Sequence, residues 1–253
     1  MTMSRWLILG ATSPIAREFA RVAAVGGADI VLAGRDIEDM ERSAADIRTR
    51  SERAVSVVEF DALDMASHEA FVRRFDEGAT GAGGEGPVGI FVAFGFMPAQ
   101  AEIDAAPELA AHVINANFTG AASVLLWLKP VLEKRKGVVV VLGSVAGDRG
   151  RASNYTYGSA KAGLHTFLQG LRIVLGRAGV RVITIKPGFI DTGMSWGVAK
   201  DGPLMAQPKA LAERALKLAD GRGEGETYFP WFWFGIMTII KSVPYKIFRR
   251  LPI

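Results

Sequence analysis

The chain has 253 residues, of which 49% are hydrophobic, and its 30 basic and 26 acidic side chains give a formal net charge of +4. So large an apolar fraction with so small a charge excludes a disordered chain, and the absence of cysteine excludes a disulfide-stabilised scaffold. The length suits one globular domain with a single core.

The basic excess is confined to the C-terminal segment. Residues 227–253 hold Lys241, Lys246, Arg249 and Arg250 and no acidic residue, so the rest of the chain is close to neutral. A nucleic-acid-binding protein carries its basic excess on a folded face, so we expect no nucleic-acid partner. The apolar residues 6–9 are too few for the core of a signal peptide, so we expect a cytoplasmic protein.

Short β-branched and apolar runs alternate with longer helical patterns along the chain. Such alternation predicts a parallel sheet covered by helices, and runs that are apolar throughout indicate strands buried on both faces. We therefore predict a single doubly wound α/β domain over residues 1–229, followed by a C-terminal tail over 230–253. The predicted strands span residues 6–9, 29–33, 55–60, 88–94, 138–142 and 182–185.

The first predicted strand runs into a turn at residues 10–16, before a helix that we expect to begin near Ile15. A turn of this kind directs backbone N–H groups and the helix dipole at a phosphate, which predicts binding of a dinucleotide. Pro14 and Ala16 stand where a glycine-rich spacing would have glycine, so a purely structural turn remains an alternative. The candidate contacts in this turn are Gly10, Thr12, Ser13, Pro14 and Ile15.

Two further strand ends carry candidate cofactor contacts. Gly34 stands where an acid would bind the ribose 2′-hydroxyl of NAD, and the next residue, Arg35, suits the 2′-phosphate of NADP, so NADP is favoured over NAD. The alternative is a solvated Arg35 beside an N-cap at Asp36. After the third strand, Asp61, followed by Ala62, either holds the adenine amino group or caps the next helix.

Tyr157 and Lys161 lie four residues apart on a predicted helix, and Ser144 ends the fifth predicted strand. Positions i and i+4 share one helix face, so the Lys161 ammonium can lie beside the Tyr157 phenol. A cation there favours the phenolate and lowers the tyrosine pKa from ~10 towards neutral pH, which suits a general acid for a ketone oxygen. Ser144 would hold the same oxygen by a second hydrogen bond.

With these motifs the sequence resembles the short-chain dehydrogenase/reductase family over residues 4–229. The resemblance implies a Rossmann domain with a parallel sheet of about seven strands, an NAD(P)-dependent oxidoreductase, and a homodimer or homotetramer built on the helices that flank strand five. It also implies a catalytic tetrad and a set of contacts around the nicotinamide. The tetrad residues are Asn117, Ser144, Tyr157 and Lys161, and the further contacts are Pro187, Gly188, Ile190 and Thr192.

One segment departs from the family pattern. The usual Asn-Asn-Ala-Gly after strand four reads here as residues 92–95, Val-Ala-Phe-Gly, in which only Gly95 matches. The packing of this loop on the adenosine ribose is the feature that the change affects.

A closer resemblance covers residues 144–151, 153–155 and the tail. This part is similar to the reductases of the decaprenylphosphoryl-ribose 2-epimerase group, which reduce a 2-keto pentose carried on a polyprenyl phosphate after a partner flavoprotein oxidase has formed the ketone. Arg149 and Arg151 are candidate phosphate contacts or solvated loop residues. The alternatives are a soluble carbonyl reductase for a small or acyl-carrier substrate, and a dinucleotide-sensing scaffold without turnover.

The tail is rich in aromatic and basic residues. Eight of the 23 aromatic residues fall in the last 27 positions, and the uncharged stretch 227–240 is too short to span a bilayer. Trp, Tyr and Lys or Arg favour the membrane interface, so we expect peripheral contact with the inner face of the membrane. An oligomer interface or a cover over the substrate cleft remains the alternative. The residues expected on one helix face, with a kink at Pro244, are Ile236, Ile239, Ile240, Val243 and Ile247.

The chain holds three histidines, His68, His112 and His165. Their spacing matches no metal site, and we expect no metal. His112 and His165 lie on predicted helices, where packing or solvent exposure is the simpler interpretation.

Overall fold

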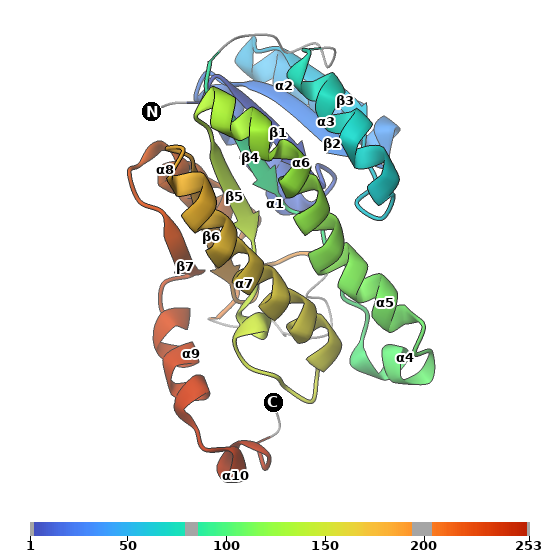
Figure 1. Ribbon diagram of the computed structural model, residues 1–253, viewed down its shortest axis with the longest axis vertical. Coiled ribbons are helices and arrows are strands. Elements are labelled where there is room, and N and C mark those ends of the chain that lie inside the picture. Colours follow the sequence, from blue (N-terminus) through green and yellow to red (C-terminus); the bar gives the residue numbers. More distant parts are fainter. Residues whose placement is uncertain (1–2, 79–85, 194–203, 252–253) are drawn as a thin grey trace.

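The computed structural model describes residues 3–78, 86–193 and 204–251. Seven parallel strands form one sheet in the order β3-β2-β1-β4-β5-β6-β7 (Figure 1). The order reverses at β1, which pairs Leu7 with Val31 of β2 and with Ile90 of β4. The strands are β1 (Arg5–Leu9), β2 (Asp29–Gly34), β3 (Val55–Glu59), β4 (Val88–Val92), β5 (Val138–Leu142), β6 (Arg181–Pro187) and β7 (Gly225–Phe229).

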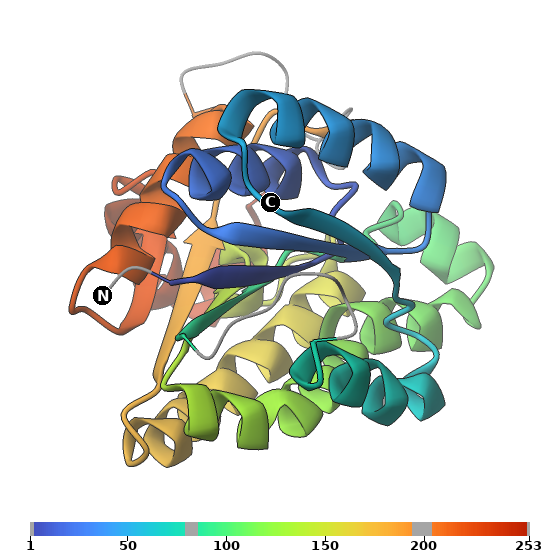
Figure 2. The same cartoon turned by 90° about the horizontal axis from the view of Figure 1, so that it is seen from above.

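Helices cover both faces of the sheet (Figure 2). One face packs against α1 (Pro14–Val25), α2 (Ile37–Ser51) and α8 (Pro208–Asp220). The other packs against α3 (His68–Asp76), α6 (Gly120–Arg135) and α7 (Tyr155–Gly176). These two apolar layers confirm the predicted doubly wound domain, because strands β1, β4 and β5 are buried along their whole length.

The smaller elements gather around the carboxyl ends of the strands. They are η1 (Met65–Ser67), α4 (Gln100–Ala105), α5 (Leu109–Ile114), the π-helical turn η2 (Asn115–Thr119), η3 (Val145–Asp148), α9 (Trp233–Ser242) and α10 (Tyr245–Phe248). Within the described ranges, one helical stretch, Leu109–Arg135, is long and apolar enough to cross a membrane. Its residues Val124, Leu125 and Leu128 are fully buried against the sheet, as in a core helix.

The six strands predicted from the sequence are all present, with ends that differ by at most two residues, and the expected count of about seven is confirmed. The seventh strand, β7, was not located from the sequence. It lies at the edge of the sheet, and its sequence Gly-Glu-Thr-Tyr-Phe is only partly buried, so it lacks the continuous apolar run of the others.

The tail forms two helices instead of one kinked helix. α9 ends at Ser242, and Val243 and Pro244 are extended before α10 begins. The expected single apolar face is wrong, because Ile236 and Ile240 pack inward with Trp233 and Met237, whereas Ile239 and Ile247 are exposed. α9 is apolar on its inner and its outer side.

Candidate active site

A cleft of about 620 Å³ lies where the strands end, and nearly all of the candidate residues line it. Asn117 and Arg149 are the candidates that do not line the cleft. The predicted residues that do line it are Gly10, Thr12, Ser13, Pro14, Ile15, Arg35, Asp61, Ala62, Gly95, Ser144, Tyr157, Lys161, Pro187, Gly188, Ile190 and Thr192.

The turn after β1 places a helix N-terminus at one end of the cleft. Gly10 has φ +82°, and a Cβ there would lie 2.7 Å from the backbone nitrogen of Phe94, so the turn requires glycine. The N–H groups of Gly10 and Ala11 donate to the carbonyl of Ala33 at 2.9 and 3.1 Å. Helix α1 then begins with Pro14 at its first position, where proline costs no hydrogen bond. This end of the cleft therefore suits an anionic group.

Of the candidate residues after β2 and β3, Asp36 and Asp61 hold the local fold by hydrogen bonds, whereas Arg35 is exposed. Asp36 is the N-cap of α2 and accepts a hydrogen bond of 3.0 Å from the Asp39 N–H, while Arg35 is exposed at the cleft. Asp61 accepts a hydrogen bond of 2.9 Å from the Leu63 N–H. Asp61 therefore closes a turn and caps no helix, since the N-cap of η1 is Asp64.

The altered loop after β4 has a packing explanation. The ring of Phe94 lies 5.9 Å from that of Phe60, measured between centroids, and its backbone lies over Gly10. Phe94 thus closes the space between the ends of β1 and β3 with an aromatic side chain.

Tyr157, Ser144 and Lys161 all line the cleft. Tyr157 and Lys161 are both buried on α7, and the Lys161 Nζ lies 5.8 Å from the centroid of the Tyr157 ring. The Lys161 ammonium donates to the Leu142 carbonyl at 3.1 Å, which ties it to the end of β5. The Ser144 hydroxyl lies beside the Tyr157 phenol, and its hydrogen-bonding effect lowers the pKa of the phenol.

Burial dominates the protonation of both groups on α7. It raises the pKa of Tyr157 to about 12, although the hydrogen bond with Ser144 acts in the opposite direction. It lowers the pKa of Lys161 to about 8. The expected lowering of the tyrosine pKa is therefore wrong for this structure, because the removal of the phenol from water outweighs the hydrogen-bonding effect of Ser144. At neutral pH the Tyr157 phenol is a proton donor.

Asn117 lies on a π-helical turn, and its side chain forms hydrogen bonds with the backbone beside the cleft. Its Nδ2 donates to the carbonyls of Phe96 at 2.6 Å and Val113 at 2.9 Å, and its Oδ1 accepts from the Phe96 N–H at 3.3 Å. The turn η2 interrupts the helical stretch at this point, as π-turns do at functional sites. Asn117 therefore fixes the loop after β4 against the helix.

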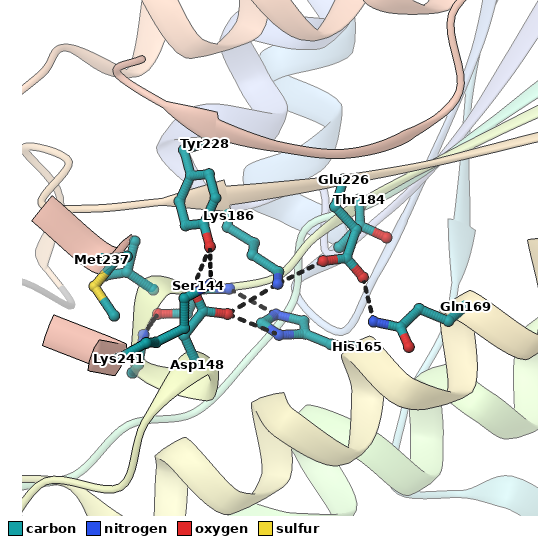
Figure 3. Close-up of polar contacts among 12 residues, drawn as sticks. Ser144, Asp148, His165, Gln169, Thr184, Lys186, Glu226, Tyr228, Met237 and Lys241 are labelled. Atoms are coloured by element: carbon teal, nitrogen blue, oxygen red, sulfur yellow. Dashed lines mark hydrogen bonds and ion pairs between the residues drawn. The ribbon is translucent and has the colours of Figure 1, made fainter. Parts of the chain in front are cut away.

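Ser144 is supported from behind by a buried histidine (Figure 3). The Ser144 N–H donates to His165 Nε2 at 3.3 Å, and His165 Nδ1 lies 3.8 Å from Asp148 Oδ1. A Cβ at Gly143 or Gly147 would lie 2.4 or 2.7 Å from the imidazole, so both glycines make room for the ring. The backbone from Gly143 to Gly147 therefore packs closely against the imidazole of His165.

Asp148 connects this histidine to the edge of the sheet (Figure 3). Lys186 Nζ lies 2.8 Å from Asp148 Oδ1 and 2.6 Å from Glu226 Oε2, and the Tyr228 hydroxyl donates to Asp148 Oδ2 at 2.6 Å. Burial alone would lower the pKa of Lys186, but the hydrogen bonds to Asp148 and Glu226 outweigh it and raise that pKa. The network is missed by sequence reasoning because its members come from η3, α7, β6 and β7 and share no local spacing.

The tail packs against residues that line the cleft. Trp233 of α9 is 3% exposed and packs against Val145, and a Cβ at Gly188 would lie 2.0 Å from its indole. The two candidate arginines differ in role. Arg149 donates to the carbonyls of Ile240 and Lys241 at the end of α9, whereas Arg151 lines the cleft.

Comparison with known proteins gives consistent similarities. The family described as short chain dehydrogenase matches residues 5–202. An uncharacterised oxidoreductase of Mycobacterium tuberculosis (strain CDC 1551 / Oshkosh) is 36% identical over 250 residues, covering 97% of this chain and 96% of the relative. An uncharacterised oxidoreductase of Streptomyces coelicolor is 36% identical over 248 residues, covering 97% and 94%.

A solved structure shows the same fold. A short chain dehydrogenase from Burkholderia cenocepacia J2315, in complex with NADP, superposes with a TM-score of 0.80 at 19% identity. The match covers 99% of this chain and 98% of that one.

Proposed function

The chain belongs to the short chain dehydrogenase family, and from this premise we propose that it is a ketone reductase that uses NADP in preference to NAD. The observation that carries the proposal is the buried Tyr157 side chain, which lines one cleft together with Ser144 and Lys161. A phenol, a hydroxyl and an ammonium arranged in this way suit proton transfer to a carbonyl oxygen.

The residues of the cleft fit a dinucleotide. The N-terminus of α1 and the Gly10 turn suit its pyrophosphate, and Arg35, with no acid at Gly34, suits a 2′-phosphate. Pro187, Gly188, Ile190 and Thr192 would hold its nicotinamide end. When bound, the cofactor supplies the hydride.

The chain's own groups then handle the proton. Ser144 and Tyr157 both donate hydrogen bonds to the carbonyl oxygen, and the Tyr157 phenol, with a pKa raised to about 12, gives up its proton to that oxygen. The Lys161 ammonium, 5.8 Å from the ring, stabilises the phenolate as it forms. The high pKa favours the direction of reduction, in which tyrosine starts protonated.

For the substrate we propose a keto-sugar carried on a polyprenyl phosphate, formed by a partner flavoprotein oxidase and reduced at the inner face of the membrane. The support lies in α9, whose inner side packs beside the cleft while Phe234 and Ile239 on its outer side are 64% and 68% exposed. An apolar helix next to a substrate cleft suits a ligand with a long apolar chain, and its basic neighbours Lys241 and Lys246 suit anionic headgroups. A soluble carbonyl reductase is the alternative.

The test is NADPH oxidation by the purified protein with a polyprenyl-phosphoryl 2-keto pentose, compared with the same keto-sugar phosphate lacking the lipid. We expect a strong preference for the lipid-linked form. Equal use of both substrates would support the reductase activity and contradict the lipid-linked substrate. Absence of turnover with these substrates and with simple ketones would contradict the reductase activity.

Tyr157→Phe is the matched variant for the chemistry. It keeps the ring and removes the acidic hydroxyl, so we expect kcat to fall by a factor of about 10²–10⁴. NADPH binding, followed by fluorescence titration, should change little. Retained turnover in this variant would show that another group protonates the oxygen.

A further inference from the structure

The cleft holds a half-buried positive charge that lacks an ion pair within the described residues. Arg151 lines the cleft, and burial lowers the pKa of its guanidinium despite the charge of Asp148. Its Nη2 lies 3.3 Å from the Val145 carbonyl and 3.3 Å from Met237 Sδ, while its buried Nε has no hydrogen-bond partner in the described ranges. Asp148 is already engaged by Lys186 and Tyr228. A half-buried cation with an unpaired N–H is stabilised by a ligand that supplies the counter-charge.

A second unpaired polar atom lies on the same stretch of chain. Asn154 Oδ1 is buried without a partner among the residues described, and Asn154 also lines the cleft. Its backbone N–H donates to the Arg151 carbonyl at 3.3 Å, so the two residues belong to one turn before α7. An amide oxygen accepts hydrogen bonds and would suit a substrate hydroxyl.

We propose that Arg151 and Asn154 form a subsite for a phosphate group of the substrate, with Arg151 binding the phosphate and Asn154 a neighbouring hydroxyl. The inference rests on the proposed function, because it places the phosphate close to the carbonyl held by Ser144 and Tyr157. The planar guanidinium is the side chain best suited to paired hydrogen bonds with phosphate oxygens.

The position of Arg151 distinguishes this subsite from the dinucleotide end of the cleft. Arg151 follows β5 and η3 and contacts Met237 of α9, whereas Gly10 and Arg35 follow β1 and β2. Arg149 is no substitute, because its guanidinium is held by the carbonyls at the end of α9 and lies 3.8 Å from the centre of the Phe248 ring. The phosphate would therefore lie next to α9, whose outer side is exposed and apolar.

Dihydroxyacetone phosphate and dihydroxyacetone form a matched pair of soluble probes, since both carry a ketone and a hydroxyl and only one carries a phosphate next to the carbonyl carbon. We expect wild-type protein with NADPH to have a higher kcat/KM for the phosphate. Arg151→Met should lower kcat/KM for dihydroxyacetone phosphate by about 10- to 100-fold and leave that for dihydroxyacetone within about twofold. Arg250→Met removes the same charge from the exposed tail and serves as the control.

A binding measurement separates failure of the subsite from failure of the reductase. Isothermal titration of dihydroxyacetone phosphate into the protein loaded with NADP⁺, which cannot reduce it, should show binding that Arg151→Met weakens at least tenfold and Arg250→Met does not. If neither ketone is turned over but Arg151→Met still weakens the binding of dihydroxyacetone phosphate, the proposed reductase activity is overturned and the proposed subsite stands. Equal loss with both probes in Arg151→Met, or unchanged binding of dihydroxyacetone phosphate, would overturn the subsite.

Discussion

His165 is buried beside the serine that the proposal places at the carbonyl oxygen, and it stays neutral there. Burial lowers its pKa to about 4, and the positive charge of Lys186 adds to this effect. A neutral imidazole can accept the Ser144 N–H at Nε2 while its Nδ1 carries a proton towards Asp148, 3.8 Å away. Because His165 stays neutral, its Nε2 remains available to accept the hydrogen bond from the Ser144 N–H.

This burial predicts a loss of stability in acid. Between pH 6.5 and 4 the unfolded chain protonates this histidine and the folded protein does not, so the free energy of unfolding falls as the pH falls, by about 3 kcal/mol in total. His165→Gln keeps an acceptor for the Ser144 N–H and removes the titrating group. Urea denaturation at pH 4.5 and 7 should show a smaller pH dependence in His165→Gln than in wild type.

An equal pH dependence in the two proteins would show that other groups, such as Glu226, govern the acid response. Burial alone would raise the pKa of Glu226, but the hydrogen bond with Lys186 outweighs it and lowers that pKa. Glu226 therefore also loses stabilisation in acid, and the difference between wild type and variant isolates the histidine.

The sequence predicts those site residues whose relation is local. Tyr157 and Lys161 share a helix face, and Gly10 lies directly after a buried strand, so spacing alone brings each to the cleft. It does not predict the contact between Asp148 and Lys186, because these residues are 38 positions apart and meet only when β5 and β6 pair. Arg149 and Arg151 look equivalent in the sequence. Only the position of α9 shows that Arg149 binds its carbonyl groups while Arg151 lines the cleft.

Among the elements, α9 differs most from its sequence-based description. The strands are predicted well because continuous apolar runs mark them, whereas β7 is an edge strand with a polar centre. α9 is apolar on both sides, so hydrophobic periodicity cannot tell which side faces the protein. The structure assigns Trp233 and Met237 to the inner side and Phe234 and Ile239 to the outer side.

Two neighbouring aromatic residues test this assignment. Trp233→Ala removes a buried indole that packs on Val145, next to Ser144, and should lower the free energy of unfolding by about 3–5 kcal/mol. Phe234→Ala removes a side chain that is 64% exposed and should lower it by less than about 1 kcal/mol. Denaturation midpoints measured in parallel give the comparison, and similar losses in both variants would contradict the packing of α9.

At the scale of the whole molecule, the helices α6 and α7 leave apolar side chains exposed on the face opposite to α1, α2 and α8. Leu126 and Trp127 of α6 are 54% and 44% exposed, and Ile173 and Val174 of α7 are 63% and 43% exposed. These are the helices on which the family resemblance implies a dimer or tetramer. An exposed apolar group of this size suits a second copy of the chain.

We therefore expect the protein to be a homodimer or homotetramer in solution, with α6 and α7 at the interface. Trp127→Glu places a charge in that interface and, because the side chain is 44% exposed in the single chain, leaves the fold of the monomer intact. Light scattering after size-exclusion chromatography should give an oligomer for wild type and a lower mass for Trp127→Glu. Trp231→Glu, at a tail position that is 82% exposed, should keep the wild-type mass. Loss of the oligomer in Trp231→Glu and not in Trp127→Glu would move the interface to the tail, and the exposed side of α9 would then bind a second chain instead of lipid.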